Sequence, residues 1–298
     1  MEVTMKLEKN PSRRNILKTG LAAAVSAAAT TSAATSPAIP SPREYAANLK
    51  KGKGETKVVC VMGDYWHNPV WQEQHVRGIF SSNRDWKVYF VLASRYLTAE
   101  LLSDTDLLIT TRYGGGDALG WTPEPIVSER PRGDTIWSDE HVEAICDNVR
   151  NRGMGFLAAH CTLFSGSKEI TDLMGISPLL HHEMQPVAFH KFNHDHPITK
   201  GITPFYTTLD DQFGVQFHDP DRITVLMENL AVHDDREMVC AWCLEQGKGR
   251  VVGLLPGDHN FIYRMPQYQD IFWRAAHWAM KRDIPAYPNA SDDDKGFN

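Results

Sequence analysis

Three histidines follow apolar runs of the sequence, at points where an imidazole could do chemistry. His67 comes five residues after the run KVVCVM, His160 ends the run GFLAAH, and His259 follows VVGLL and a Pro-Gly-Asp turn. The pKa of an imidazole lies near neutrality, so such a side chain can donate or accept a proton in catalysis. Neutral imidazoles beside a carboxylate also suit zinc or another divalent cation. Acid–base chemistry, with or without metal assistance, is therefore the first hypothesis.

The spacings that identify the common cofactor sites do not occur. The sequence has neither an HExxH motif nor paired CxxC motifs, so the metal and any other cofactor stay unknown. The glycine triplet 114–116 lacks the GxGxxG spacing, and we expect no nucleotide cofactor.

Side chains that could hold a hydroxyl-rich ligand follow the apolar run DLLITTRY at 106–113. Guanidinium, phenol and backbone groups at such a position can orient a polar ligand. The predicted substrate-binding residues are His67, Arg112, Tyr113, Gly114 and Trp242.

The five cysteines are an odd number, which excludes a complete disulfide framework. Cys240 and Cys243 have the spacing of a redox or metal pair, but they lie in a segment that predicts two strands around a turn. Extended chain points these two side chains to opposite faces and separates them too far for a disulfide. Cys161 directly follows His160, and we expect its thiol to point elsewhere, which disfavours a thiol hydrolase.

The elements that must position these residues are short apolar strands alternating with helices. Strands are predicted at 57–62, 86–93, 106–113 and 155–160, and helices at 70–82 and 138–151, the latter with Ser138 as its N-cap. This alternation predicts an α/β fold whose mostly parallel sheet has helices on both faces. After residue 186 the pattern is richer in strands and includes a β-hairpin extension, and a last helix begins at Pro266. Ligands bind beyond the carboxyl ends of parallel strands, so the candidate residues should meet at one edge.

The two ends of the chain lack the alternating strand and helix pattern of the middle. Arg13 and Arg14 precede a weakly apolar stretch rich in Ala, Ser and Thr, which resembles a bacterial twin-arginine export signal at 1–38. We expect a linker at 39–56, one domain at 57–284, and an acidic tail at 285–298. Export places the protein in the periplasm or cell envelope, with no stable membrane span after signal cleavage.

The charge of the chain indicates which classes of partner it binds. The net charge is −6 and no basic block occurs after residue 60, so we expect no nucleic-acid partner. A small molecule is the expected partner, and a homo-oligomer is compatible with the sequence.

Several pieces of the sequence, taken in order, resemble the ThuA-like family, which is named for trehalose utilization. They are GFLAAHC, HDHPITKGI, LDDQF, the GKGRV hairpin that carries Trp242, and PGDH before a final helix with tryptophans. The resemblance implies a fold of the flavodoxin-like, class I glutamine amidotransferase-like superfamily. In the amidotransferase relatives a cysteine nucleophile occupies the strand-to-helix elbow, whereas ThuA-like proteins have a histidine there, at the position of His160. Other family-like positions are His67, His75, His181 or His182, His196, Asp211 and His259.

The resemblance adds a function to the acid–base hypothesis. It implies a protein acting on a carbohydrate or a (keto)sugar derivative as a hydrolase, lyase or isomerase, with His160, Asp211 and His259 as catalytic residues. The family commonly has Gly-His in the last loop, whereas here Asp258 stands between Gly257 and His259, so either residue could fill that position. The alternative is a non-catalytic sugar-binding module on a degenerate amidotransferase fold.

Overall fold

A computed structural model of the protein describes residues 39–64, 66–113 and 137–288. The predicted export signal at 1–38, Gly114 and residues 289–298 lie outside these ranges.

The described part of the chain is built around a parallel sheet. Its five parallel strands are β1 (Thr56–Val61), β2 (Trp86–Val91), β3 (Leu107–Thr110), β4 (Gly155–Ala159) and β11 (Gly249–Leu254). They lie in the order β2-β1-β3-β4-β11, which is the flavodoxin-like order. Every residue of β1, β3 and β4 is buried, because helices cover both faces and select continuous apolar runs. The predicted fold class is confirmed.

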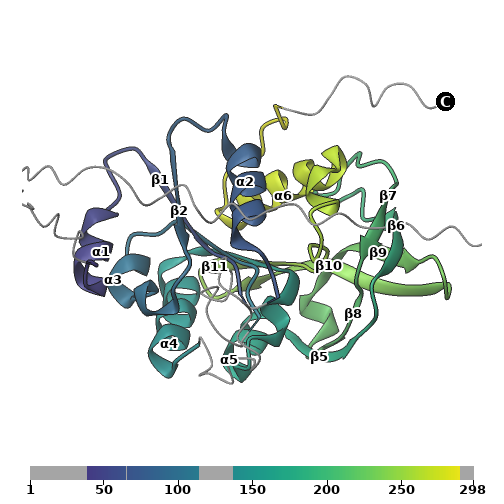
Figure 1. Ribbon diagram of the computed structural model, residues 1–298, viewed down its shortest axis with the longest axis horizontal. Helices are drawn as coiled ribbons and strands as arrows, with labels where there is room; N and C mark the ends of the chain where they lie inside the picture. The colour runs from purple at the N-terminus through teal and green to yellow at the C-terminus, as the bar shows by residue number, and fades with distance from the viewer. Residues whose placement is uncertain (1–38, 65, 114–136, 289–298) are drawn as a thin grey trace, which may run out of the picture. The chain divides into compact units, whose positions relative to one another are not determined.

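Helices form a layer on each face of this sheet (Figure 1). One layer contains α2 (Pro69–Phe80) and α6 (Pro266–Ala279), and the other contains α3 (Ala99–Leu102), α4 (Asp139–Asp147) and α5 (Lys168–Met174). Ser138 caps α4 by accepting a hydrogen bond from the backbone of His141, as predicted, and Pro266 occupies the first turn of α6. A π-helical turn, Asn148–Arg152, follows α4 and ends at Gly153.

The boundaries of the domain are wider than we expected. The supposed linker at 39–56 contains helix α1 (Pro42–Asn48), which a Ser41–Glu44 capping box starts and which buries Ala46 beside α3. At the other end, Tyr287 is buried and the indole of Trp273 donates a hydrogen bond to the Pro285 carbonyl. These contacts extend the packed domain in both directions.

The expected hairpin extension is larger than one hairpin. Beyond β11 the sheet continues with the antiparallel strands β10 (Arg236–Gln246), β9 (Thr224–Ala231), β6 (Gln185–Phe192) and β7 (Phe205–Asp210). A separate pair, β5 (Ile176–His181) and β8 (Phe213–Phe217), forms a second small sheet. Cys240 and Cys243 are buried and unpaired in β10, which confirms the prediction of two strand cysteines.

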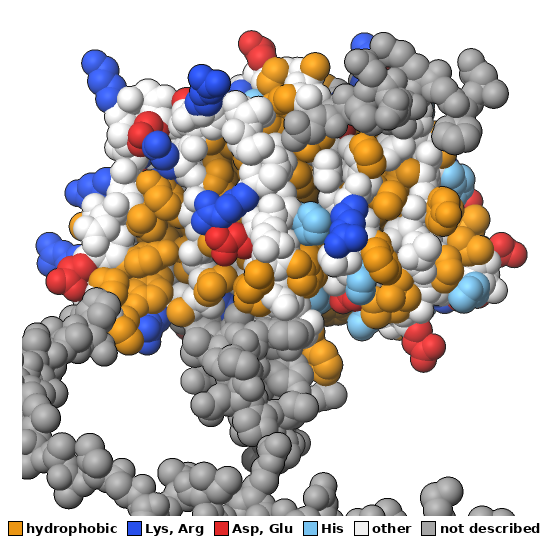
Figure 2. Space-filling model, turned by 45° about the horizontal axis from the view of Figure 1, so that its top comes forward, with side chains coloured by type: hydrophobic (Ala, Val, Ile, Leu, Met, Phe, Trp, Pro, Cys, Tyr) orange, Lys and Arg blue, Asp and Glu red, His pale blue; other side chains and the backbone are white. Residues whose placement is uncertain are grey.

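The surface is mixed in charge. On the face that Figure 2 shows, basic and acidic side chains are scattered among apolar and polar ones and form no large block of one sign. Among the helices of the described ranges, none has the length and apolar character needed to cross a membrane.

Candidate functional site

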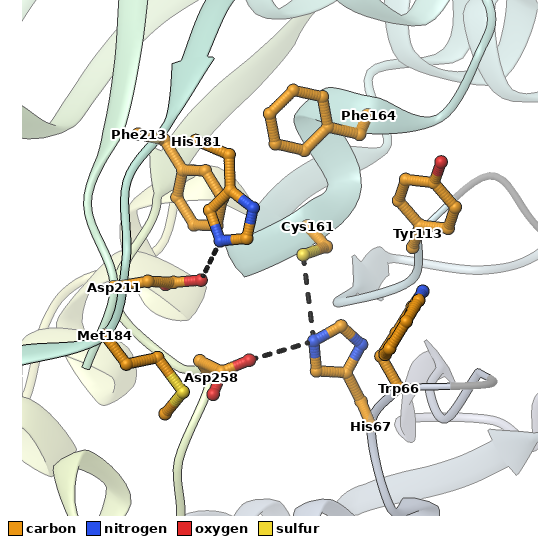
Figure 3. A pocket seen from close by; sticks show the side chains of 10 residues that line it. All are labelled: Trp66, His67, Tyr113, Cys161, Phe164, His181, Met184, Asp211, Phe213 and Asp258. Carbon is orange, nitrogen blue, oxygen red and sulfur yellow. Dashed lines mark hydrogen bonds and ion pairs between the residues drawn. The ribbon is translucent and has the colours of Figure 1, made fainter. Parts of the chain in front are cut away.

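A pocket of about 430 Å³ lies where the carboxyl ends of β1, β3, β4 and β11 meet. The order of the parallel strands reverses between β1 and β3, which is where α/β sheets of this type bind ligands. Figure 3 shows the side chains that line the pocket. They are Trp66, His67, Tyr113, Cys161, Phe164, His181, Met184, Asp211, Phe213 and Asp258.

The loop after β1 presents His67 to the pocket in a fixed orientation. The buried carboxylate of Asp64 accepts hydrogen bonds from the backbone N–H groups of Trp66 (2.8 Å), His67 (3.1 Å) and Tyr113 (2.8 Å). It also lies 2.7 Å from Nδ1 of His67. Burial raises the pKa of Asp64, but the hydrogen bonds outweigh this effect and lower it, so the carboxylate is ionised. The Nδ1 atom of His67 therefore carries a proton, and Nε2 faces the pocket.

His160 stands at the elbow after β4, as the sequence predicts. Its φ of 44° lies in the left-handed region, which is unusual for a residue other than glycine, and a 3-10 helix (His160–Phe164) follows it. The imidazole is fully buried beneath the pocket and does not line it. Its Nδ1 atom donates to the Leu255 carbonyl at 3.1 Å, and its Nε2 atom lies 3.0 Å from Nε2 of His67.

Cys161 faces the pocket, and the expectation that its thiol points elsewhere is wrong. Its Sγ atom lies 3.7 Å from Nε2 of His67 (Figure 3). The alternation of side chains that holds within a strand ends at the left-handed residue 160, so residue 161 is not on the opposite side. Burial raises the pKa of the thiol, but His160 and His67 lower it by more, which favours the thiolate.

Asp258, rather than His259, occupies the last loop of the site. Its Oδ1 atom lies 3.3 Å from Nε2 of His67 and 3.5 Å from Nε2 of His160. The buried carboxylate of Asp210 accepts hydrogen bonds from the backbone N–H groups of Gly257 and Asp258, which fixes this loop. Burial raises the pKa of Asp258, but the hydrogen bonds with His160 and His67 lower it much further. The structure does not bring His259, a predicted catalytic residue, to the pocket, because its ring packs on Phe261 and does not line it.

Asp211 and His181 form a pair on the opposite wall of the pocket. The Oδ2 atom of Asp211 lies 2.7 Å from Nε2 of His181, and the carboxylate is buried whereas 57% of the His181 side chain is exposed. The imidazole stacks on Phe213, whose strand β8 pairs with β5 at this position. The hydrogen bond to Asp211 raises the pKa of His181 above its ordinary value.

The remaining predicted residues divide into those inside and those outside the pocket. Tyr113 lines it, and Gly114 lies outside the described ranges. Arg112 does not line it, because this neighbour of Tyr113 points inward, where it is fully buried and its guanidinium lies 3.4 Å from the Leu92 carbonyl.

Trp242, also predicted to bind substrate, does not line the pocket either. It is fully buried on β10, its indole donates to the Met174 carbonyl at 2.9 Å, and its ring covers Gly253 of the neighbouring strand. Of the other family-like positions, His75 stacks on Tyr263, and His196 lies 3.5 Å from the thiol of Cys243. Neither histidine lines the pocket.

Of the residues singled out in the sequence, the structure brings together His67, Tyr113, His160, His181, Asp211 and Asp258, and it adds Asp64 and Cys161 to them. Asp64 could have been found from its place shortly after a strand, whereas the direction of Cys161 depends on the left-handed backbone of His160. The assembled groups can transfer protons, can activate a thiol, or can bind a cation. Among the described residues, His67 with His160 and Cys161, and His160 with Asp211 and Asp258, have donor atoms close enough to hold a metal ion. Oδ1 of Asp258 also lies within 3.5 Å of Nε2 of both His67 and His160.

Comparisons with known proteins agree with this architecture. Residues 57–279 match the ThuA family, described as trehalose utilisation. A ThuA-like protein from Parabacteroides merdae is similar in structure, with a TM-score of 0.59 and 15% identity over 79% of this chain and 94% of the other. A ThuA-like protein from Bacteroides uniformis has a TM-score of 0.53 and 13% identity over 79% of this chain and 97% of the other. Among curated proteins no sequence match is found.

Proposed function

The chain belongs to the ThuA family, and on that premise we propose that its pocket binds a carbohydrate or keto-sugar derivative and transfers a proton to it. The family description, trehalose utilisation, supports a sugar-derived substrate. The proposed proton transfer is argued from the side chains that line the pocket.

The observation that carries the proposal is the His181–Asp211 pair. The imidazole is open to a ligand in the pocket, and the buried carboxylate behind it lies 2.7 Å from Nε2. A carboxylate in this place orients the ring and stabilises its protonated form, as in other catalytic histidine–carboxylate pairs. Because Asp211 raises the pKa of His181, the imidazole keeps its proton to higher pH than an ordinary histidine, which suits a general acid.

The walls of the pocket suit a ligand of sugar size. A volume of about 430 Å³ falls within the range of small-molecule sites. The rings of Trp66, Tyr113 and Phe164 line one part of it, where the apolar C–H faces of a sugar ring can pack. Carboxylates and imidazoles line the rest and can hydrogen-bond to hydroxyl groups.

A keto sugar fits this chemistry because its carbonyl acidifies the neighbouring C–H bond. A carboxylate or imidazole that lines the pocket accepts the proton of this C–H bond, negative charge develops on the carbonyl oxygen, and a proton from His181 neutralises it there. Asp211 then stabilises the imidazole as it regains its proton. This oxygen protonation is a step that hydrolysis, elimination and isomerisation of such a sugar can share.

A second candidate, thiol hydrolysis, is favoured by the alignment of Cys161, His67 and Asp64. The thiol lies 3.7 Å from Nε2 of His67, and Asp64 holds Nδ1 of the same ring at 2.7 Å. A nucleophile, a base and an orienting carboxylate stand in that order in cysteine hydrolases.

Turnover of a panel of keto and unmodified disaccharides by wild-type protein and two variants tests the proposal. His181→Gln should lower the rate by about 10²- to 10⁴-fold, the usual contribution of a general acid. His182→Gln is the matched control, because this neighbouring residue does not line the pocket. Sugar binding without turnover would instead support the non-catalytic sugar-binding module.

A further inference from the structure

The imidazoles of His67 and His160 present their Nε2 atoms to each other at 3.0 Å. In each ring the N–H group at Nδ1 already donates a hydrogen bond. That of His67 donates to the Asp64 carboxylate, and that of His160 donates to the Leu255 carbonyl oxygen. A carbonyl oxygen and an ionised carboxylate only accept hydrogen bonds, so these two partners select the same tautomer in both rings. Two neutral rings would therefore bring two lone pairs face to face, and a cation between them removes this repulsion.

We propose that Nε2 of His67, Nε2 of His160 and Oδ1 of Asp258 bind one divalent cation, with zinc as the preferred metal. The three atoms are separated by 3.0, 3.3 and 3.5 Å. In a tetrahedral zinc site with bonds of about 2.0–2.2 Å, neighbouring ligand atoms lie about 3.3–3.6 Å apart. The three donors thus form one nearly correct face of a tetrahedron, and two imidazoles with one carboxylate are a donor set that zinc accepts.

Each of the three ligands is held in place by a second group. Asp64 orients His67, the carbonyl of Leu255 orients His160, and Asp210 binds the backbone of the loop that carries Asp258. Groups of this kind, which fix the tautomer and rotation of a ligand, are typical of zinc sites. They also reduce the entropy that the protein loses when the ion binds.

Charge and burial favour a cation at this point. His67 and His160 are buried, 77% of the Asp258 side chain is shielded from solvent, and the thiol of Cys161 lies beside them. Carboxylates enclosed in this way need positive charge nearby. A single shared proton would satisfy the two nitrogens alone, whereas a metal ion also satisfies the carboxylate oxygen of Asp258.

The ion would lie at the floor of the pocket. His67 and Asp258 line the pocket and His160 lies beneath it, so an ion held by the three would be accessible from the pocket. Catalytic zinc sites keep an open position for water or substrate, where the metal polarises an oxygen. Only this consequence rests on the proposed sugar chemistry, since the metal site itself follows from the three donors.

Metal content is the direct test and requires no substrate. Purified protein is treated with a chelator, loaded with zinc, desalted and analysed by mass spectrometry for bound metal. We expect one zinc ion per chain and a higher melting temperature with zinc, because an ion that binds only the folded state stabilises it. Cobalt loading should add the visible absorption of a four-coordinate ion.

Variants locate the site. Asp258→Asn keeps the shape of the side chain but removes the anionic ligand, and Asp64→Asn disturbs the orientation of His67. Asp64→Asn should weaken zinc binding by about 10- to 100-fold, and Asp258→Asn by at least as much. His259→Gln is the matched control and should bind zinc as the wild type does, because its side chain lies outside the pocket. Circular dichroism verifies that each variant is folded.

Two results would overturn the metal site: folded wild-type protein that retains no zinc, or undiminished zinc binding in Asp258→Asn. Zinc bound at this site without turnover of any sugar would contradict the proposed function and leave the metal site standing. Sugar turnover by zinc-free protein would support the proposed function and show that catalysis does not require the ion.

Discussion

Proton positions on single imidazoles decide what each histidine of the pocket can do. The Nε2 atom of His67 faces His160 and Asp258 across the pocket floor, whereas Nε2 of His181 faces a buried carboxylate at 2.7 Å and its ring remains exposed. The first arrangement is suited to holding a cation and the second to exchanging a proton with a ligand. We therefore propose different roles for these histidines.

The pKa of His181 should depend on Asp211. Asp211→Asn removes the charge that raises this pKa, so the imidazole should lose its proton at lower pH than in the wild type. If His181 is the general acid, the alkaline limb of the activity profile moves toward acid pH by the same amount. An NMR titration of the His181 ring measures the shift directly, with Asp221→Asn as a surface control. An unchanged titration would show that Asp211 does not tune this ring.

Cys161 should be dispensable for proton transfer. Cys161→Ala leaves the His181–Asp211 pair and the three proposed metal ligands in place, so most of the activity should remain. Steady-state kinetics on the folded variant measure this. A complete loss of turnover, with zinc binding retained, would instead establish Cys161 as the nucleophile of a thiol hydrolase.

At the level of elements, the close approach of β10 and β11 explains why Trp242 belongs to the core. A Cβ atom added at Gly253 would lie 2.4 Å from the indole of Trp242, and the indole N–H is already bonded to the Met174 carbonyl. The glycine thus makes room for the largest side chain of the neighbouring strand.

Gly253→Ala should therefore destabilise the fold without altering the site chemistry. Overpacking of this kind costs about 1–3 kcal/mol in the free energy of unfolding, which urea denaturation measures. Gly78→Ala on α2 is the control, because a Cβ there meets no atom within 4 Å and alanine favours the helix. Equal stabilities for the two variants would contradict the packing account of Trp242.

At the level of the whole molecule, one buried histidine that does not line the pocket should make stability depend on pH. The ring of His277 on α6 packs at 4.9 Å from Trp86 and 4.7 Å from Trp273. Burial lowers its pKa from 6.5 to about 4. As the pH falls through this window, the unfolded chain takes up a proton that the folded protein does not, so the free energy of unfolding decreases.

His277→Phe should keep the aromatic packing and remove this titration. We expect similar stability at pH 7 and a shallower loss of stability between about pH 6.5 and 4 than in the wild type. Melting temperatures recorded across this range measure the difference. Parallel curves for the two proteins would show that His277 does not contribute.

Export concerns the whole chain and is a prediction from the sequence alone. Replacing Arg13 and Arg14 by lysine should retain the precursor inside the cell, because lysine lacks the forked guanidinium that distinguishes a twin-arginine signal. Fractionation of the cell envelope measures this. Unchanged export would refute the assignment of residues 1–38.

The sequence alone was sufficient for the fold and for the edge at which the site forms. Continuous apolar runs can be buried only in a sheet covered on both faces, and residues that follow such strands meet at its carboxyl edge. For this reason His67, Tyr113 and His160 could be named before their positions were known. The ends of the domain were harder to predict from the sequence, because the packing of α1 and Tyr287 depends on partners distant in the sequence.

Only the tertiary structure decided which of two adjacent residues enters the site. Cys161 joins His160, Asp258 replaces His259, and Tyr113 faces the pocket while Arg112 does not. Strands and helices have fixed side-chain periods that can be read along a sequence, but loops have none. There the direction of each side chain depends on the backbone angles of that residue, such as the φ of 44° at His160, and on the packing that holds them.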